Sequence, residues 1–361
     1  MITIAVLRFR IPSPKAYRAG HAHAIQHVRR KSPCCRSRLG AIPGRIDISA
    51  SLSRVDLMPF QMTCRKPDDV RPSASGDRKK SVEMTKADPS FNTFEYVDGQ
   101  RRDTHPDLLA RFEARSLETI RHHKAELDVN YGSHPRQKLD VFFAQGPARG
   151  AILYFHPGYW QSRDKSTFRF LAMAFTTIGY DFILANYPLC PDVRLDELVD
   201  HVAESIPFSL SYLANAGSAN GGLIVAGHSA GGHLAVEMAL RTWPTTVCNG
   251  RPVQKIVAIS GVYELVPLVS TPLNDKLQLS DEDARANSPA YRVTDVGVPG
   301  IFVVGSGETS EFRRQSRNIH DIWRSAGNQA TYVEVPEADH FSVVSDLSST
   351  QIPTLLAASE P

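Results

Sequence analysis

The chain has 361 residues, of which 41 are Lys or Arg and 38 are Asp or Glu, so its formal net charge at pH 7 is +3. This length allows one large α/β domain of about 250 residues together with an extra segment. The sequence contains no run of about 18 apolar residues, so we expect no membrane-spanning helix. It has five cysteines and no C-x-x-C pair or Cys/His cluster with metal-binding spacing, so we expect free thiols, no metal and no cofactor.

The first part of the chain differs in charge from the rest. Residues 1–66 contain thirteen Lys and Arg but only two acids, Asp47 and Asp56, which gives a net charge of +11 and leaves −8 for the remainder. No sustained helical or strand period runs through residues 1–88. We therefore predict a basic, disordered extension over 1–88 and a folded domain over 89–361.

Three interpretations of this extension are open. It could be an Arg-rich targeting peptide, an arm that binds nucleic acid or a membrane surface, or a translated upstream region before a true start at Met84. We favour the last, because the apolar residues 2–7 are too few for a secretory signal and no basic segment precedes them. For the folded domain we expect a cytoplasmic location and neither a nucleic-acid nor a membrane partner.

A helix is predicted directly after the extension. Residues 104–107 resemble a capping box, and apolar residues recur at helical spacing from Leu108 to Ile120. This pattern indicates an amphipathic helix that ends near His123 and covers part of the core.

Apolar segments of strand length follow, and helical segments separate several of them. This alternation predicts a mostly parallel sheet with helices on both faces. The predicted strands are 139–143, 151–155, 182–186, 223–227, 255–260, 301–305 and 331–335, and the predicted helices are 168–178, 195–214, 230–241 and 311–326.

The loop over residues 156–160 follows the predicted strand 151–155. Backbone N–H groups held in such a loop stabilise the negative charge of a tetrahedral intermediate, each by on the order of 10²–10³ in rate. Pro157 has no N–H, so Gly158 and Tyr159 are the predicted donors. The side chain of His156 is predicted to brace the loop through hydrogen bonds.

The segment Gly227-His228-Ser229-Ala230-Gly231 matches the pattern G-x-S-x-G. An apolar strand precedes it and helix-forming residues follow it, which is the context of a nucleophile elbow. Small residues are needed there because the chain turns sharply from strand to helix and leaves the serine hydroxyl exposed above the sheet. We predict that Ser229 is the nucleophile, that Ala230 supplies a third oxyanion donor, and that His228 is structural.

A serine hydroxyl needs a base, and this pattern places an acid and then a histidine after the nucleophile. His340 lies in the loop after the last predicted strand and is the predicted base. The acid should follow the preceding strand, which makes Glu308 the leading candidate. Glu311 remains an alternative, although an acid at a helix start often serves only as a cap.

Together these residues resemble the α/β-hydrolase superfamily, and within it the kynurenine formamidase-like branch near the hormone-sensitive-lipase-type esterases. The resemblance spans about residues 90–350 and implies the α/β-hydrolase fold. The segments that carry it are 156–161, 164–166, 187–191, 194–198, 227–234, 260–265, 311–316 and 339–341.

The resemblance also implies roles for single residues. The nucleophile of the family falls on Ser229, its histidine on His340 and its acid on Glu308, and its oxyanion donors fall on Gly158, Tyr159 and Ala230. The family usually has aspartate where Glu308 stands and glycine where Pro157 stands. Because glutamate is longer by one methylene, its loop should lie slightly further from His340.

We therefore expect a serine hydrolase that cleaves a small acyl ester or an N-formyl amide through an acyl-enzyme. The resemblance implies N-formylkynurenine as the substrate, and a general carboxylesterase is the alternative. A ligand-binding protein on a hydrolase scaffold is disfavoured, because candidates for nucleophile, base and acid are all present. Aromatic side chains are the candidate walls of the substrate pocket, namely Tyr159, Trp160, Phe168, Tyr187, Tyr263 and Phe341.

Overall fold

The computed structural model describes residues 88–218, 221–345, 347, 350 and 352–357. They all belong to one compact unit of the chain, which spans Arg78–Pro361. The first described residue, Asp88, is the N-cap of helix α1 (Pro89–Tyr96), and its carboxylate accepts a hydrogen bond from the backbone N–H of Ser90 at 2.9 Å. The rest of the predicted extension, residues 1–87, lies outside the described residues.

An eight-stranded sheet forms the centre of the unit, with the strand order β1-β2-β4-β3-β5-β6-β7-β8. Strand β2 is antiparallel to both its neighbours, β1 and β4. The remaining strands, β3 to β8, run parallel to one another. Every residue of β4 and of β7 is buried, as expected for parallel strands covered on both faces. The strands are β1 (Ala125–Asn130), β2 (Lys138–Phe142), β3 (Gly150–Phe155), β4 (Tyr180–Ala185), β5 (Leu223–His228), β6 (Val253–Ile259), β7 (Gly300–Gly305) and β8 (Ala330–Val335).

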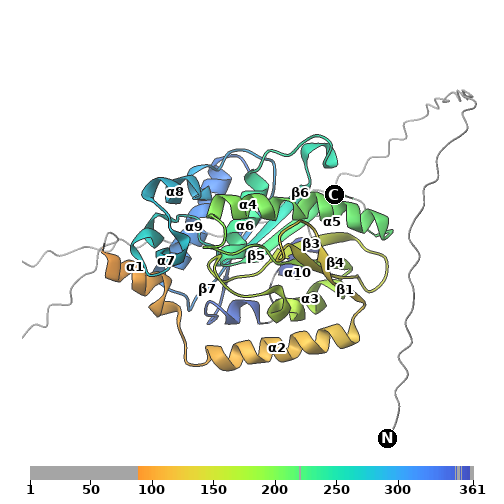
Figure 1. Cartoon of the computed structure of the whole chain (residues 1–361), viewed down its shortest axis with the longest axis horizontal. Coiled ribbons are helices and arrows are strands. Elements are labelled where there is room, and N and C mark those ends of the chain that lie inside the picture. The colour runs from red at the N-terminus through yellow and green to blue at the C-terminus, as the bar shows by residue number, and fades with distance from the viewer. Residues whose placement is uncertain (1–87, 219–220, 346, 348–349, 351, 358–361) are drawn as a thin grey trace, which may run out of the picture. The chain divides into compact units, whose positions relative to one another are not determined.

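Helices cover both faces of this sheet (Figure 1). Alternate residues of one strand point to opposite faces, so in β4 Phe182 and Leu184 join one apolar core while Ile183 and Ala185 join the other. The first core is closed by α2 (His105–His122), the 3₁₀ helix η2 (Lys165–Leu171), α3 (Ala172–Thr176), η6 (Ser342–Val344) and α10 (Ile352–Ala357). The second is closed by α1, α4 (Leu195–Ala203), α5 (Ser205–Asn215), α6 (Ala230–Leu240), η4 (Val266–Ser270), α7 (Asn274–Leu277), α8 (Asp281–Ala286), η5 (Pro289–Tyr291) and α9 (Ser310–Ser325).

The mostly parallel sheet and its two helical layers confirm the predicted α/β architecture. The predicted helix 195–214 is wrong in one respect, because it is two helices, α4 and α5, that meet at Glu204. Proline has no N–H and clashes with the carbonyl four residues earlier, so Pro207 in the first turn of α5 prevents one continuous helix. The predicted helix 168–178 is likewise divided into η2 and α3.

One further expectation at the start of the domain is corrected, and one strand there was not predicted. Thr104 precedes α2 with helical backbone angles, and its side chain makes no capping hydrogen bond, so the predicted capping box is absent. Strand β1 was not predicted; half of its residues are polar and most of them are exposed. Its pairing with β2 makes it a strand, and this pairing depends on tertiary structure.

Candidate active site

Ser229 lies in the turn between β5 and α6, with φ 56° and ψ −118°. A positive φ is unfavourable for a residue other than glycine, so packing around the turn must hold it. A Cβ on Gly227 would lie 2.1 Å from the carbonyl oxygen of Gly231, and a Cβ on Gly231 would lie 2.0 Å from that of Phe155. The turn therefore requires glycine at both positions, which is the physical basis of the motif.

His340 and Glu308 are brought together from two different loops. Glu308 lies between β7 and α9, His340 follows β8, and Glu308 Oε2 is 2.7 Å from His340 Nδ1. Both side chains are almost fully buried. His340 and Ser229 line the same cavity, which has a volume of about 310 Å³. With Nδ1 engaged by the carboxylate, Nε2 is the nitrogen of His340 that can accept a proton.

The second oxygen of Glu308 is held by two donors. Its Oε1 accepts hydrogen bonds from Ser260 Oγ at 2.5 Å and from the backbone N–H of Gly305 at 2.8 Å. Sequence reasoning missed Ser260, which comes directly after β6 with φ 47°. The sequence gives two signals there, a polar residue at the carboxyl end of a buried strand and the segment 260–265 that shares in the resemblance, but neither assigns it this role.

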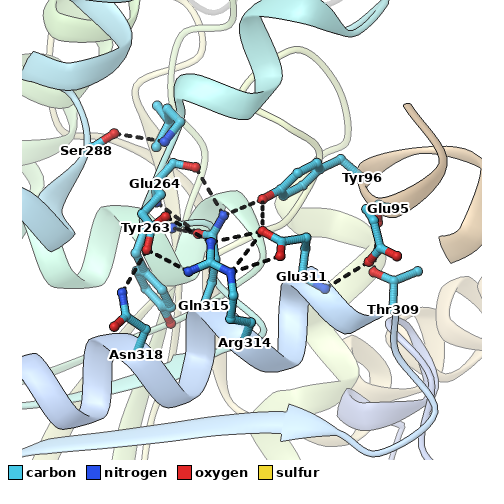
Figure 2. A network of polar contacts seen from close by, with 11 residues as sticks. Glu95, Tyr96, Tyr263, Glu264, Ser288, Thr309, Glu311, Arg314, Gln315 and Asn318 are labelled. Carbon is cyan, nitrogen blue, oxygen red and sulfur yellow. Dashed lines mark hydrogen bonds and ion pairs between the residues drawn. The ribbon is translucent and has the colours of Figure 1, made fainter. Parts of the chain in front are cut away.

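Glu311, the alternative acid, is directed to other partners (Figure 2). Its Oε1 lies 2.9 Å from Arg314 Nε, and its Oε2 accepts a hydrogen bond from Tyr96 Oη at 3.1 Å. Arg314 also donates to both carboxylate oxygens of Glu264, at 3.0 and 2.8 Å. Glu311 is thus part of a polar network beside the site, and the carboxylate on His340 is that of Glu308.

The loop after β3 presents three consecutive residues with positive φ, namely Gly158 at 128°, Tyr159 at 51° and Trp160 at 59°. Gly158 must be glycine, because a Cβ there would lie 2.2 Å from the carbonyl oxygen of Ser162. The carbonyl oxygen of Gly158 accepts hydrogen bonds from the backbone N–H groups of Gln161 and Ser162, at 3.0 and 3.1 Å, and these bonds fix the turn.

Two of the predicted oxyanion donors, Gly158 and Tyr159, line the cavity together with Ser229. The third, Ala230, is the first residue of α6, where a backbone N–H has no partner within the helix. All three therefore stay predictions that fit the geometry of the loop and of the elbow.

His156 braces this loop, as the sequence suggested. Its Nδ1 is 2.7 Å from the carbonyl oxygen of Pro157, and its ring stacks on Tyr187 with 4.3 Å between centroids. Tyr187 Oη also donates to the carbonyl of His156 at 2.7 Å. Burial lowers the pKa of His156 to about 4, so its imidazole is neutral at pH 7.

Because this imidazole is buried in its neutral form, we expect the protein to lose stability in mild acid. Its pKa is about 4 in the folded state and near 6.5 in the unfolded state, so the unfolded state binds more protons between these values. The stabilising contribution is full above pH 6.5 and is lost as the pH falls to 4, by up to roughly 3 kcal/mol. Replacing His156 with Gln should therefore make the unfolding free energy less dependent on pH between 6.5 and 4, as measured by urea denaturation.

The comparison with His156→Gln removes the contributions of other groups. Burial raises the pKa of Glu237 to about 7, which acts in the opposite direction over this range in both proteins. Asp164, whose pKa is about 2 despite its partial burial because backbone and side-chain hydrogen bonds lower it, contributes only below pH 4. An equal pH dependence in the wild type and the variant would contradict the assignment to His156.

The structure places the candidate pocket walls in two different environments. Tyr159 and Phe341 line the cavity, whereas Trp160, Tyr187 and Tyr263 are fully buried and do not. These three lie in the core, where burial of their large apolar surface is favourable. Trp160 packs edge-on against His233, Tyr187 stacks on His156, Tyr263 packs against Phe302, and Phe168 packs against Phe112.

Other cavity walls were not anticipated from the sequence. Most of them come from the stretch between the last residue of α1 and the first residue of α2, and from α7 with the residue before it. No motif marks them, and only tertiary packing brings them to Ser229. They are Tyr96, Val97, Gln100, Arg101, His105, Leu273 and Lys276, and Gln161, Ser162 and Arg163 from the loop after β3 also line the cavity.

Over the described part of the chain, no group of three or more His, Cys, Asp and Glu side chains could hold a metal ion. Within the same residues, no helix is both long enough and apolar enough to cross a membrane. Cys190, which is buried, and Cys248, which is exposed, are free thiols. The other cysteines, Cys34, Cys35 and Cys64, lie outside the described residues.

Comparison with known proteins gives four results that fit this geometry. A family model described as an alpha/beta hydrolase fold matches residues 152–343. The kynurenine formamidase of Danio rerio is 31% identical over 228 residues, which are 61% of this chain and 76% of that protein.

Two solved structures share the fold. A protein from Silicibacter sp. TM1040 is 26% identical with a TM-score of 0.63, and the match covers 73% of this chain and 97% of that one. Esterase B from Lactobacillus rhamnosis is 18% identical with a TM-score of 0.55, over 71% of this chain and 94% of the esterase.

Proposed function

This chain belongs to the α/β-hydrolase family and is a hydrolase of ester or formamide bonds, and from this premise we propose that it acts through Ser229 on N-formylkynurenine. Ser229 Oγ attacks the formyl carbon while His340 Nε2 takes its proton. The proton then passes to the amine that leaves, and a formyl-enzyme remains. Water, activated by the same imidazole, releases formate and restores Ser229.

The hydrogen bond between Glu308 and His340 is the observation that carries this mechanism. The 2.7 Å contact at Nδ1 holds the imidazole in the tautomer whose Nε2 can act as base, and the negative charge stabilises the imidazolium that forms. Ser260 and the N–H of Gly305 hold the carboxylate in turn. The added methylene of glutamate is accommodated, since its carboxylate reaches the ring within normal hydrogen-bond distance.

The oxyanion of the intermediate is stabilised by the backbone N–H groups of Gly158, Tyr159 and Ala230. Backbone donors that are fixed before the reaction need no reorganisation as negative charge develops on the carbonyl oxygen. The positive φ of Gly158 and Tyr159 and the helix start at Ala230 support this assignment.

The cavity supports a small aromatic substrate. Its volume of about 310 Å³ is at the lower end of the range for small-molecule sites. Two aromatic residues, Tyr159 and Phe341, line it beside Ser229, and their rings can contact an aryl group. The formyl group is the smallest acyl group, and the kynurenine formamidase relative supports this choice of amide.

Substrate turnover tests the proposal. The purified protein should hydrolyse N-formylkynurenine with a higher kcat/KM than p-nitrophenyl acetate or p-nitrophenyl butyrate, and release of formate should match release of kynurenine. Hydrolysis of both esters without turnover of N-formylkynurenine would overturn the formamidase proposal in favour of a general carboxylesterase.

A further inference from the structure

Residues 95–102 connect α1 with the start of α2, and we name this segment the strap. It lies outside the residues 152–343 that match the family model. Nevertheless four of its residues line the cavity that contains Ser229 and His340, namely Tyr96, Val97, Gln100 and Arg101. Its hydrogen bonds reach both the loop that carries Glu308 and the loop that carries the predicted oxyanion donors.

The first set of contacts joins the strap to the chain just after Glu308. Gln100 Nε2 donates to Thr309 Oγ1 at 2.8 Å, and this hydroxyl donates to the carbonyl of Glu95 at 2.7 Å. The carboxylate of Glu95 accepts from the backbone N–H of Glu311 at 2.8 Å. A single hydroxyl group, that of Thr309, thus completes two hydrogen bonds to the strap.

A second contact joins the strap to the chain just before Glu308. Arg102 Nη2 donates to the carbonyl of Gly307 at 3.0 Å. The strap therefore holds the acid loop on both sides of Glu308. A guanidinium donor gives a stronger hydrogen bond than a neutral group.

A third contact joins the strap to the loop after β3. Tyr159 Oη donates to the carbonyl of Tyr96, next to the left-handed turn at Gly158. Tyr96 is itself fixed, because its hydroxyl donates to Glu311 at 3.1 Å and accepts from Gln315 Nε2 at 2.6 Å (Figure 2). Tyr96 is also fully buried, so this hydroxyl depends on these partners.

We propose that the strap is a positioning element of the active site, which holds the acid loop against the oxyanion loop and so keeps Glu308 and the oxyanion donors in one geometry. The proposal rests on the catalytic roles given above to Glu308 and to the N–H of Tyr159. A displacement of about 1 Å in a catalytic group can cost on the order of 10² in rate, so the loss of one anchoring hydroxyl should be visible in kcat.

The substitution Thr309→Val tests the first anchor, because it keeps the shape of the side chain and removes only the hydroxyl. We expect kcat for p-nitrophenyl acetate to fall about 10-fold with KM changed less than about 2-fold. Thr309→Ser, which retains the hydroxyl, should restore most of the rate. A lower Tm with an unchanged kcat in Thr309→Val would show a purely structural role and overturn the proposal.

The substitution Tyr159→Phe tests the other anchor and does not depend on the folding of Thr309→Val. It removes the bond to the Tyr96 carbonyl but keeps the backbone N–H, and kcat should again fall about 10-fold. The double variant should lose less than the product of the two single effects, because both act through the strap. A loss of kcat in the double variant equal to the full product of the two single losses would contradict this coupling.

A matched control is Tyr332→Phe, which removes a tyrosine hydroxyl that donates to Glu334 at 3.0 Å and does not line the cavity. Its kcat should equal that of the wild type. Because the substrate is an ester, the result does not depend on whether N-formylkynurenine is hydrolysed. If Glu308→Gln is harmful and both strap variants are not, only the strap proposal fails; if Glu308→Gln is harmless, the role of Glu308 fails.

Discussion

Replacing Ser229 with alanine should lower kcat by about 10⁶-fold for every ester or formamide substrate, with little change in KM. Without the hydroxyl no acyl-enzyme can form, and the base and acid have no nucleophile to activate. The residual rate above that of water should come from the oxyanion donors and from substrate binding. Steady-state hydrolysis of N-formylkynurenine and of p-nitrophenyl acetate measures the effect.

Covalent labelling provides a direct readout of the same substitution. A fluorophosphonate should add one phosphonyl group to the wild type, located by mass spectrometry on the peptide that contains Ser229, and none to Ser229→Ala. Ser325→Ala, at the exposed end of α9, is the control and should behave as the wild type. Label on another serine of the active protein would overturn the assignment of the nucleophile.

Replacing Glu308 with glutamine should lower kcat by about 10⁴-fold, the size found when the acid of a serine triad is made neutral. The amide can present its N–H₂ to His340 Nδ1 and so favour the wrong tautomer, and it cannot stabilise the imidazolium. Glu308→Asp keeps the charge but shortens the side chain by one methylene, so its kcat should lie between those of the wild type and Glu308→Gln.

Two comparisons make this test specific to Glu308. Glu334→Gln removes a carboxylate that pairs with Arg317 away from the cavity, and its kcat should not change. Glu311→Gln alters the network with Arg314 and Tyr96 and should cost far less than Glu308→Gln. A loss of about 10⁴-fold in Glu311→Gln instead would assign the orienting role to Glu311.

The order of the catalytic candidates along the chain was readable because the fold is parallel. Ser229 follows β5, Glu308 follows β7 and His340 follows β8, and the carboxyl ends of parallel strands meet at one edge of the sheet. Apolar runs therefore predicted both the strands and the place where their following loops converge. The choice between Glu308 and Glu311 could not be made this way, because both follow β7 and only the loop conformation directs one of them to His340.

Side-chain direction was the least predictable property of the site. Trp160 and Tyr159 are neighbours in one loop, yet Tyr159 lines the cavity and Trp160 is fully buried against the core. Composition cannot separate them, because both are large aromatic residues that gain from burial. The break between α4 and α5 is a different case, since Pro207 was visible in the sequence and its effect on the helix follows from its missing N–H.

The sequence by itself determined the features that depend on a few neighbouring residues or on the type of each segment. The elbow around Ser229 is one, because its strand, turn and helix follow one another directly and glycine at 227 is required by a contact with nearby Gly231, and the buried parallel strands are another. Only the tertiary structure decided what surrounds the nucleophile. The carboxylate of Glu95 accepts a hydrogen bond from the backbone N–H of Glu311, which is 216 positions further along the chain. Such a contact arises from the packing of α1 on α9. The strap, the support of Glu308 by Ser260 and the cavity walls all depend on packing of this kind, which no local pattern encodes.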